Sequence, residues 1–275
     1  MVMEMEFGAR SDTGCVRENN EDSYRAAPEM NLFVLSDGMG GLESGEVASR
    51  LAVDTIIEQC RRADANASLP LMGARVDGVS EMTNRLAGAV RAANKVVHDA
   101  AQRNANAPSM GATVVAVRFS NERMSLAHVG DSRAYRLRGA DLEQLTHDHS
   151  FVAEQIRQGR MTEQEAGTST FQNVLVRALG IEPAVEVDAS EELVMEGDTV
   201  LLCSDGLTHE LSDSQIAAVL RENGDAQEAA DRLIELAKQA GGGDNVTAIV
   251  IRPAQKPVGA FARIGRLGKW FKGSA

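Results

Sequence analysis

Residues 32–41 read LFVLSDGMGG, four large apolar residues followed by a serine, an aspartate and a glycine-rich stretch. The run from Leu32 to Leu35 is typical of a buried β-strand, and Asp37 follows it within two residues. A sheet holds the backbone at the end of a strand, so polar side chains there are well placed to bind a ligand. Asp37-Gly38 is also a common turn signal. This stretch alone leaves both a binding site and a simple turn open.

The combination of a strand and an adjacent aspartate occurs three more times. Strands are predicted at residues 113–117, 124–129, 199–203 and 246–251. Asp131 follows the second of these and Asp205 the third, whereas Asp244 comes just before the last. Turn chemistry explains any one of these aspartates, but it is a weaker explanation for all of them together.

Helical spacing of apolar residues appears in two segments, 45–62 and 84–103. The chain also turns back on itself between Phe119 and Met124, which is typical of antiparallel strands. Runs of strands with covering helices predict an α+β fold of packed sheets. Residues 147–180 are less regular, with a helix-like run at 151–158, and we interpret them as a mobile flap.

Composition excludes several classes of protein. A length of 275 residues favours one large domain. A net charge of -12 argues against nucleic-acid binding and suits a site that collects cations. The start, MVMEMEF, lacks the positive charge of a signal peptide, and no apolar run is long enough to span a bilayer, so we predict a cytoplasmic protein. Cys15, Cys60 and Cys203 show no paired spacing, which predicts buried or unreactive thiols rather than a zinc site.

The last residues, 253–275, carry five basic side chains and no acidic ones: Lys256, Arg263, Arg266, Lys269 and Lys272. On a helical wheel the apolar residues fall opposite the basic ones, which is the pattern of a helix that binds a membrane surface or a partner. Glycines in this segment weaken such a helix, and a disordered tail is the alternative.

The acidic residues suggest a metal centre. If the strands are neighbours, several carboxylates converge, and they stay ionised together only with cations between them. Oxygen ligands without histidine or cysteine favour Mg or Mn over Zn or Cu. Two such ions sharing a carboxylate lower the pKa of a bridging water and place the hydroxide for attack on phosphorus. Spacing alone predicts a metal site of unknown purpose.

Six motifs in order resemble the bacterial metal-dependent protein phosphatases of type 2C, the PPM family. The motifs are Arg17-x-x-x-Glu21-Asp22, Ser36-Asp37-Gly38-Met39-Gly40-Gly41, Met110-Gly111-Ala112-Thr113, Val129-Gly130-Asp131-Ser132-Arg133, Ser204-Asp205-Gly206-Leu207 and Gly243-Asp244-Asn245-Val246-Thr247. Each motif is weak by itself, and together they cover about residues 8 to 252. The resemblance implies an α-β-β-α sandwich of two antiparallel sheets flanked by helices, with a phosphatase domain at 1–252 and a tail at 253–275.

The resemblance also implies roles for single residues. It implies that two Mn or Mg ions, and a third at a weaker site, are held by Glu21, Asp37, the Gly38 carbonyl, Asp131, Asp205 and Asp244. Asp37 would bridge the two main ions, Asp205 and Asp244 would complete the first site, and Glu21 with Gly38 the second. Asp131 would join Asp205 at the third. Arg17 would bind the substrate phosphate, which agrees with the forked fit of guanidinium to phosphate oxygens. Asp22 and Asn245 would orient metal-bound water.

Two positions depart from the family pattern. Met39 stands where many eukaryotic relatives carry a histidine thought to protonate the leaving alcohol. A thioether cannot donate a proton, which leaves the general acid unassigned. Ala112 replaces a usual threonine, a change that we expect to be structural.

The implied activity is hydrolysis of phosphoserine and phosphothreonine in proteins by a metal-bridging hydroxide, with Asp37, Asp205 and Arg17 as the catalytic residues. The implied partners are phosphorylated proteins and a serine/threonine kinase of the same bacterium, and we expect a monomer. A catalytically inactive member that binds phosphoproteins is the alternative. A dinucleotide-binding turn at Gly38-Met39-Gly40 is disfavoured because Asp37 would repel a pyrophosphate. For His147 and His149, packing or hydrogen bonding is favoured over metal binding.

Overall fold

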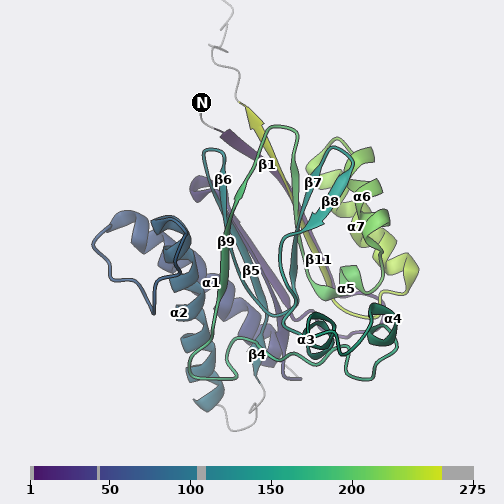
Figure 1. Ribbon diagram of the computed structural model, residues 1–275, viewed down its shortest axis with the longest axis horizontal. Coiled ribbons are helices and arrows are strands. Elements are labelled where there is room, and N and C mark those ends of the chain that lie inside the picture. The colour runs from purple at the N-terminus through teal and green to yellow at the C-terminus, as the bar shows by residue number, and fades with distance from the viewer. Residues whose placement is uncertain (1–2, 42–43, 104–109, 256–275) are drawn as a thin grey trace, which may run out of the picture.

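Two antiparallel sheets face each other, and helices cover both outer faces (Figure 1). The computed structural model describes residues 3–41, 44–103 and 110–255. One sheet has the strand order β1 (Met3–Asp12), β11 (Val246–Gln255), β10 (Thr199–Cys203), β7 (Arg133–Arg138) and β8 (Asp141–Gln144). The other has the order β2 (Asp22–Ala27), β3 (Leu32–Met39), β5 (Val114–Ser120), β6 (Arg123–Val129) and β9 (Asp188–Leu193), with β4 (Gly111–Ala112) paired to β3.

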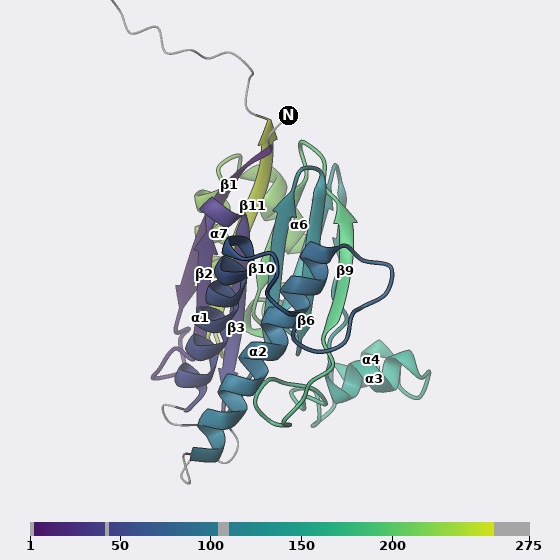
Figure 2. The ribbon, with the colours of Figure 1, turned by 90° about the vertical axis from the view of Figure 1, so that its left-hand side faces the viewer.

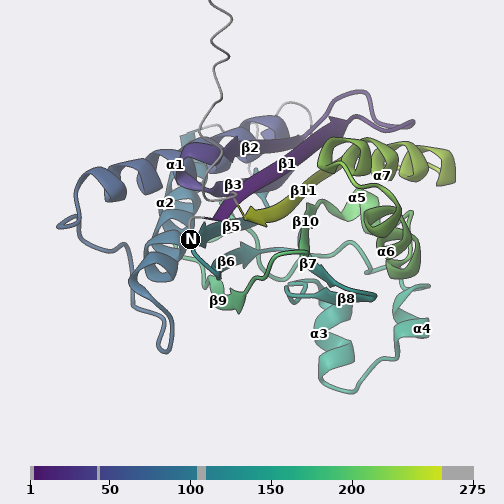
Figure 3. The same ribbon diagram turned by 90° about the horizontal axis from the view of Figure 1, so that it is seen from above.

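Two helices lie on each side of the sandwich. The sheet that contains β3 is covered by α1 (Ser44–Ala65) and α2 (Glu81–Arg103), which cross its outer face in Figure 2. The sheet that contains β10 is covered by α6 (Asp213–Glu222) and α7 (Ala226–Ala240), so that the four layers can be followed from above in Figure 3. The short helices are η1 (Pro28–Met30), α3 (Phe151–Arg157), α4 (Glu163–Ala166) and α5 (Asp205–Thr208).

The central strands are apolar on both faces because each face meets a different core. On β3, Phe33 and Leu35 pack between the sheets, whereas Leu32 and Val34 pack under α1 and α2. Side chains alternate along a strand, so a strand between two cores must be apolar at every position. This is why the central strands appear in the sequence as unbroken apolar runs.

The predicted α-β-β-α sandwich is confirmed, with two differences in its strands. β3 runs to Met39, so Asp37 and Gly38 belong to a strand and the turn explanation for this pair is wrong. β4 extends the ladder, because Gly38 pairs with Ala112, and Thr113 N–H donates to the Asp37 carbonyl at 2.8 Å. The predicted return between Phe119 and Met124 is a β5–β6 hairpin with Asn121 at a φ of 54°.

The carboxyl end of the domain also differs from the sequence prediction. β11 continues to Gln255 and pairs with β1 as far as Met3, so the sheet extends past the boundary predicted at residue 252. Pro253, at the predicted start of the tail, is buried opposite Met5. The rest of the predicted basic tail, residues 256–275, lies outside the described residues. Within the described part of the chain, no helix has the length and apolar composition that crossing a membrane requires.

Several elements were not predicted. The sequence patterns did not predict β1, β2, β7, β8, β9, α6 and α7. β9 reads DASEEL and is only partly buried, so it shows no apolar signal. Cys60 and Cys203 are buried as expected, whereas Cys15 is exposed.

The core between the sheets offers a test of the fold. Phe33 is fully buried there and makes edge-to-face contacts with Phe7 and Phe119. Phe33→Ala should lower the free energy of unfolding by about 3–5 kcal/mol, because it leaves a cavity in a packed core. Val16→Ala, at a side chain 69% exposed, should change it by less than about 0.5 kcal/mol. Urea unfolding measures both values, and equal midpoints for the two variants would contradict the assignment of this core.

Candidate metal centre

The strand ends bring four aspartates to one edge of the sandwich. Asp37, near the end of β3, lies directly opposite Asp22 on β2. Asp205 begins α5 immediately after β10, and Asp131 lies in the turn between β6 and β7. Burial and the charges of the other three raise the pKa of Asp37 well above its usual value. These four carboxylates therefore form one electrostatic cluster.

The pKa values of the other three aspartates in the cluster are also raised. Burial, with Asp205 nearby, raises the pKa of Asp131 to about 8. Burial, opposed by two hydrogen bonds, raises that of Asp22 to about 7. The pKa of Asp205 is also raised, by burial and by Asp244. Carboxylates in such a cluster hold protons or bind cations, since like charges at close range cannot all stay ionised alone.

Two oxygens in the cluster have free lone pairs. Asp22 Oδ1 and Asp205 Oδ1 are buried and accept no hydrogen bond from the residues that the structure describes. The other oxygen of Asp22 accepts from Ser204 Oγ at 2.8 Å and from Thr247 Oγ1 at 2.6 Å, which fixes the carboxylate in place. Hard oxygen donors with unsatisfied lone pairs fit a divalent cation such as Mg or Mn.

Glu21 and Gly38 lie where β2 and β3 meet the start of α1. A Cβ atom on Gly45 would come within 2.6 Å of the Glu21 carboxylate carbon, and one on Gly38 would overlap the Gly45 carbonyl. The Gly38 N–H donates to the Glu21 carbonyl at 3.1 Å. Gly38 is therefore required for the close approach of the two backbones, and a side chain at Gly45 would displace the Glu21 carboxylate. A lone glycine at the start of a predicted helix is the only sign of this role for Gly45 in the sequence.

Asp244 forms an ion pair with Arg17. Its Oδ2 accepts from Arg17 Nη2 at 2.8 Å, and the Arg17 side chain is 53% exposed. The hydrogen bond and the charge of Asp244 raise the pKa of Arg17. The predicted phosphate ligand and a predicted metal ligand are therefore paired with each other. A cation at Asp244 and a phosphate at Arg17 would each replace half of this ion pair.

The Asn245 side chain forms hydrogen bonds with the backbone of residues 13, 19 and 21. Its Oδ1 accepts from Glu21 N–H at 2.8 Å, and its Nδ2 donates to the carbonyls of Thr13 and Asn19, both at 2.9 Å. Every hydrogen on the amide is thus used by backbone oxygens. The side chain therefore holds the backbone of Glu21 against the start of β11, and its role in orienting metal-bound water stays a prediction.

Thr113 and Ser132 tie two of the motifs together. Thr113 Oγ1 accepts from Asp37 N–H at 3.0 Å and lies 2.6 Å from Ser132 Oγ, next to Asp131. Both residues belong to motifs of the family, but nothing in the sequence indicates this contact between their hydroxyls. Ala112 is fully buried and pairs with Gly38, as expected for a structural change.

A cavity of about 750 Å³ opens beside Asp131 and Asp205, and α3 and α4 of the predicted flap line its far side. His209 lies on its wall with Nδ1 3.7 Å from Asp205 Oδ2. The cavity therefore borders two members of the acidic cluster.

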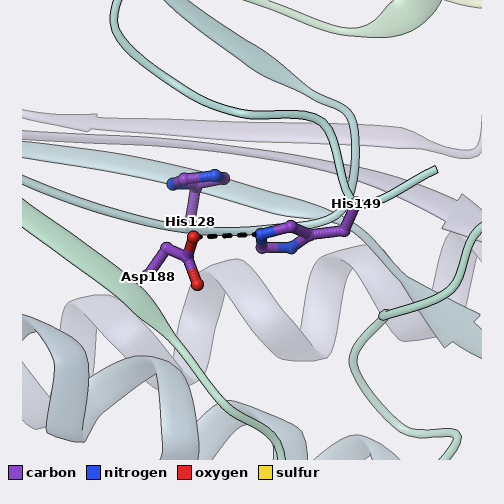
Figure 4. Close-up of side chains that lie close together, drawn as sticks. All are labelled: His128, His149 and Asp188. Carbon is purple, nitrogen blue, oxygen red and sulfur yellow. Dashed lines mark ion pairs between the residues drawn. The ribbon is translucent and has the colours of Figure 1, made fainter. Parts of the chain in front are cut away.

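Outside this centre, His128, His149 and Asp188 point toward one another (Figure 4). Their ligand atoms lie within 4.8 Å of each other, which is a distance suited to a metal ion. The Arg177 guanidinium already supplies the positive charge that a metal ion would bring to this group. Its Nη1 is 2.5 Å from Asp188 Oδ1 and 3.1 Å from His149 Nε2. We therefore interpret this group as an ion pair that holds the flap.

Hydrogen bonds complete this anchor. His149 Nδ1 accepts from Gly130 N–H at 3.1 Å, directly before Asp131. His128 Nε2 bonds the His147 carbonyl at 3.0 Å, and the rings of His128 and His149 stack at 4.9 Å. The hydrogen bonding predicted for His147 and His149 is confirmed. His149 bonds through its ring and His147 through its backbone carbonyl.

Comparison with known proteins places this arrangement in a family. The sequence pattern of the protein phosphatase 2C family matches residues 16–240. The serine/threonine protein phosphatase PstP of Mycobacterium tuberculosis is 37% identical over 91% of this chain, which spans 45% of that relative. The serine/threonine phosphatase stp of Listeria monocytogenes is 34% identical, over 90% of this chain and 95% of its own. The catalytic domain of PstP, solved in complex with two manganese ions, has a TM-score of 0.78 at 37% identity, covering 93% of this chain and 100% of its own.

Without divalent ions, the protein should become less stable as the pH rises from about 5 to about 8. In this range the folded chain keeps protons on Asp22 and Asp131 that the unfolded chain has released, so stability falls with increasing pH. Asp131→Asn should lose part of this dependence. Asp54→Asn, at a surface carboxylate paired with Arg25, should keep it. Melting temperatures in EDTA measure the slopes, and equal slopes in wild type and Asp131→Asn would refute the assignment.

Proposed function

The chain belongs to the protein phosphatase 2C family, and on that premise we propose that it hydrolyses phosphoserine and phosphothreonine esters in proteins with the help of divalent ions. The observation that carries the proposal is the cluster of Asp22, Asp37, Asp131 and Asp205, with two buried carboxylate oxygens that accept no hydrogen bond from described residues. The names of the relatives, serine/threonine phosphatases, support the substrate class.

The proposed ligands divide between two ions and a third, weaker site. Asp37 would contribute to both main sites, Asp205 and Asp244 would complete the first, and Glu21 with the Gly38 carbonyl would complete the second. Asp131 and Asp205 would hold the third ion. When bound, Mn or Mg would lower the pKa of coordinated water and supply a nucleophile for phosphorus.

The chain's own residues position the substrate. The exposed guanidinium of Arg17 lies at the edge of the cluster and can exchange Asp244 for a phosphate, whose oxygens fit its forked donors. Asp22 is held through one carboxylate oxygen by Ser204 and Thr247, and its other oxygen is buried without a hydrogen bond from the described residues. Met39 offers no proton to the leaving alcohol, so we leave the general acid unassigned.

The substrates in this proposal are phosphorylated proteins, and the reaction opposes a serine/threonine kinase. A cytoplasmic location, a monomeric state and a contact through the basic tail remain predictions from the sequence. An inactive member that only binds phosphoproteins is the alternative. It is disfavoured because all the carboxylates that the proposed ion sites need are present.

Hydrolysis should depend on metal and on Asp37. With Mn added, wild type should release phosphate from p-nitrophenyl phosphate and from a phosphothreonine peptide, and excess EDTA should abolish both. Asp37→Asn should lower the rate by at least about 100-fold, since a neutral amide cannot bridge two cations. Asp54→Asn should retain the wild-type rate. Full activity in EDTA, or in folded Asp37→Asn, would exclude the proposed centre.

Arg17→Ala should act mainly on substrate binding. We expect KM for the phosphothreonine peptide to rise about 10-fold, because a hydrogen bond to a charged group contributes about 1.5–3 kcal/mol and solvent access reduces that value. Arg17→Lys should recover part of the loss, since it keeps the charge without the fork. Steady-state kinetics with Mn measure KM and kcat separately. An unchanged KM in Arg17→Ala would show that another group binds the phosphate.

A further inference from the structure

A mainly apolar groove lies beside the candidate metal centre, between the end of β3 and the segment that joins the flap to β9. Its volume is about 360 Å³, within the usual range for ligand pockets of about 300–1,000 Å³. The apolar part of its lining comes from Met39, Leu175, Val176, Ile181 and Val185. None of these residues has a role in the proposed hydrolysis.

Met39 links the groove to the metal centre. Phe33 and Leu35 face the space between the sheets, so by alternation Asp37 and Met39 point to the same side of β3. Side chains two residues apart on a strand are about 7 Å apart. The groove therefore begins about one side-chain spacing from Asp37.

Met39 and Ile181 meet over a glycine. A Cβ atom on Gly111 would lie 2.7 Å from Met39 Cε and 3.0 Å from Ile181 Cδ1. The missing side chain at Gly111 leaves room for both, and both line the groove. A thioether is apolar and flexible, so Met39 suits the packing of an apolar ligand.

The walls of the groove are exposed yet held in place. Val176 is 55% exposed and Ile181 46%, and both line the groove. Exposing two apolar side chains to water at one place is unfavourable. Their segment is held by backbone hydrogen bonds, from Val176 N–H to the His149 carbonyl and from Leu179 N–H to the Ala112 carbonyl, both 2.8 Å. The Arg177–Asp188 ion pair adds a third anchor. The groove is thus preformed, without depending on its exposed side chains.

The rim of the groove carries acidic side chains. Glu182 and Glu186 are exposed there, and the charge of Arg177 is matched by Asp188 at 2.5 Å and Glu186 at 3.5 Å. The rim therefore has an excess of negative charge. Such a rim disfavours acidic residues in a ligand and tolerates basic ones.

We propose that this groove binds an apolar side chain of the phosphoprotein substrate, two residues from the phosphorylated serine or threonine. In an extended peptide, side chains two residues apart lie on one side at about 7 Å, the same spacing as Asp37 and Met39. A phosphate at the metal centre then places the second side chain over Met39 and Ile181. The inference rests on the proposed function and adds a substrate preference to it.

Paired peptides test the preference. Four phosphothreonine peptides carry leucine or serine two residues before or after the phosphothreonine and are otherwise identical. With Mn, wild type should show a kcat/KM about 10-fold higher for leucine than for serine on one of the two sides. Ile181→Ser and Val176→Ser should each reduce this ratio to about 2-fold. Leu193→Ser, at an equally exposed side chain on β9, should leave the ratio at its wild-type value.

The outcomes separate the two proposals. A ratio near one on both sides in wild type, or a ratio unaffected by both groove variants, would overturn the groove assignment while hydrolysis itself continued. Failure of folded wild type to hydrolyse any of the four peptides and p-nitrophenyl phosphate would overturn the proposed function, and this inference with it. Because the readout is a ratio within each variant, a partial loss of folded protein does not change it.

Discussion

The repulsion among Asp22, Asp37, Asp131 and Asp205 is the constraint on which the rest of the structure depends. Burial and, after it, the neighbouring negative charges raise the pKa values of all four carboxyl groups, so holding them together in this place costs free energy. The two sheets meet this cost because their cores fix the strands whose ends carry the carboxylates. In the proposed metal centre, a cation would be bound by groups that are already in position.

A set of hydroxyl and amide groups holds the acidic residues in place. Thr247 and Ser204 orient Asp22, Thr113 bonds the backbone of Asp37, and Asn245 holds the Glu21 loop. Removal of such a group would move a carboxylate without changing the charge of the site. The geometry of the centre therefore depends on residues that are not themselves proposed to touch metal.

Arginines form ion pairs with aspartates at two places. Arg17 pairs with Asp244 at the centre, and Arg177 pairs with Asp188 beside His149. The second pair joins the flap to β9, and His149 in turn bonds the backbone just before Asp131. The flap that bounds the groove near Met39 is thus fixed through the same residues that support the acidic cluster. The proposed substrate groove and the proposed metal centre would therefore share one structural support.

The sequence by itself determined the central strands, the aspartates next to them and the family. Strands between two cores must be apolar throughout, so they are visible as short apolar runs, and six motifs keep their order along the chain. The partly exposed β9 and the partners of Asp244 and Asn245 were decided by the tertiary structure alone. Arg17 and Asp244 are 227 positions apart, and Glu21 and Asn245 are 224 apart. Contacts over such separations arise only when the two sheets pack, and no local pattern records them.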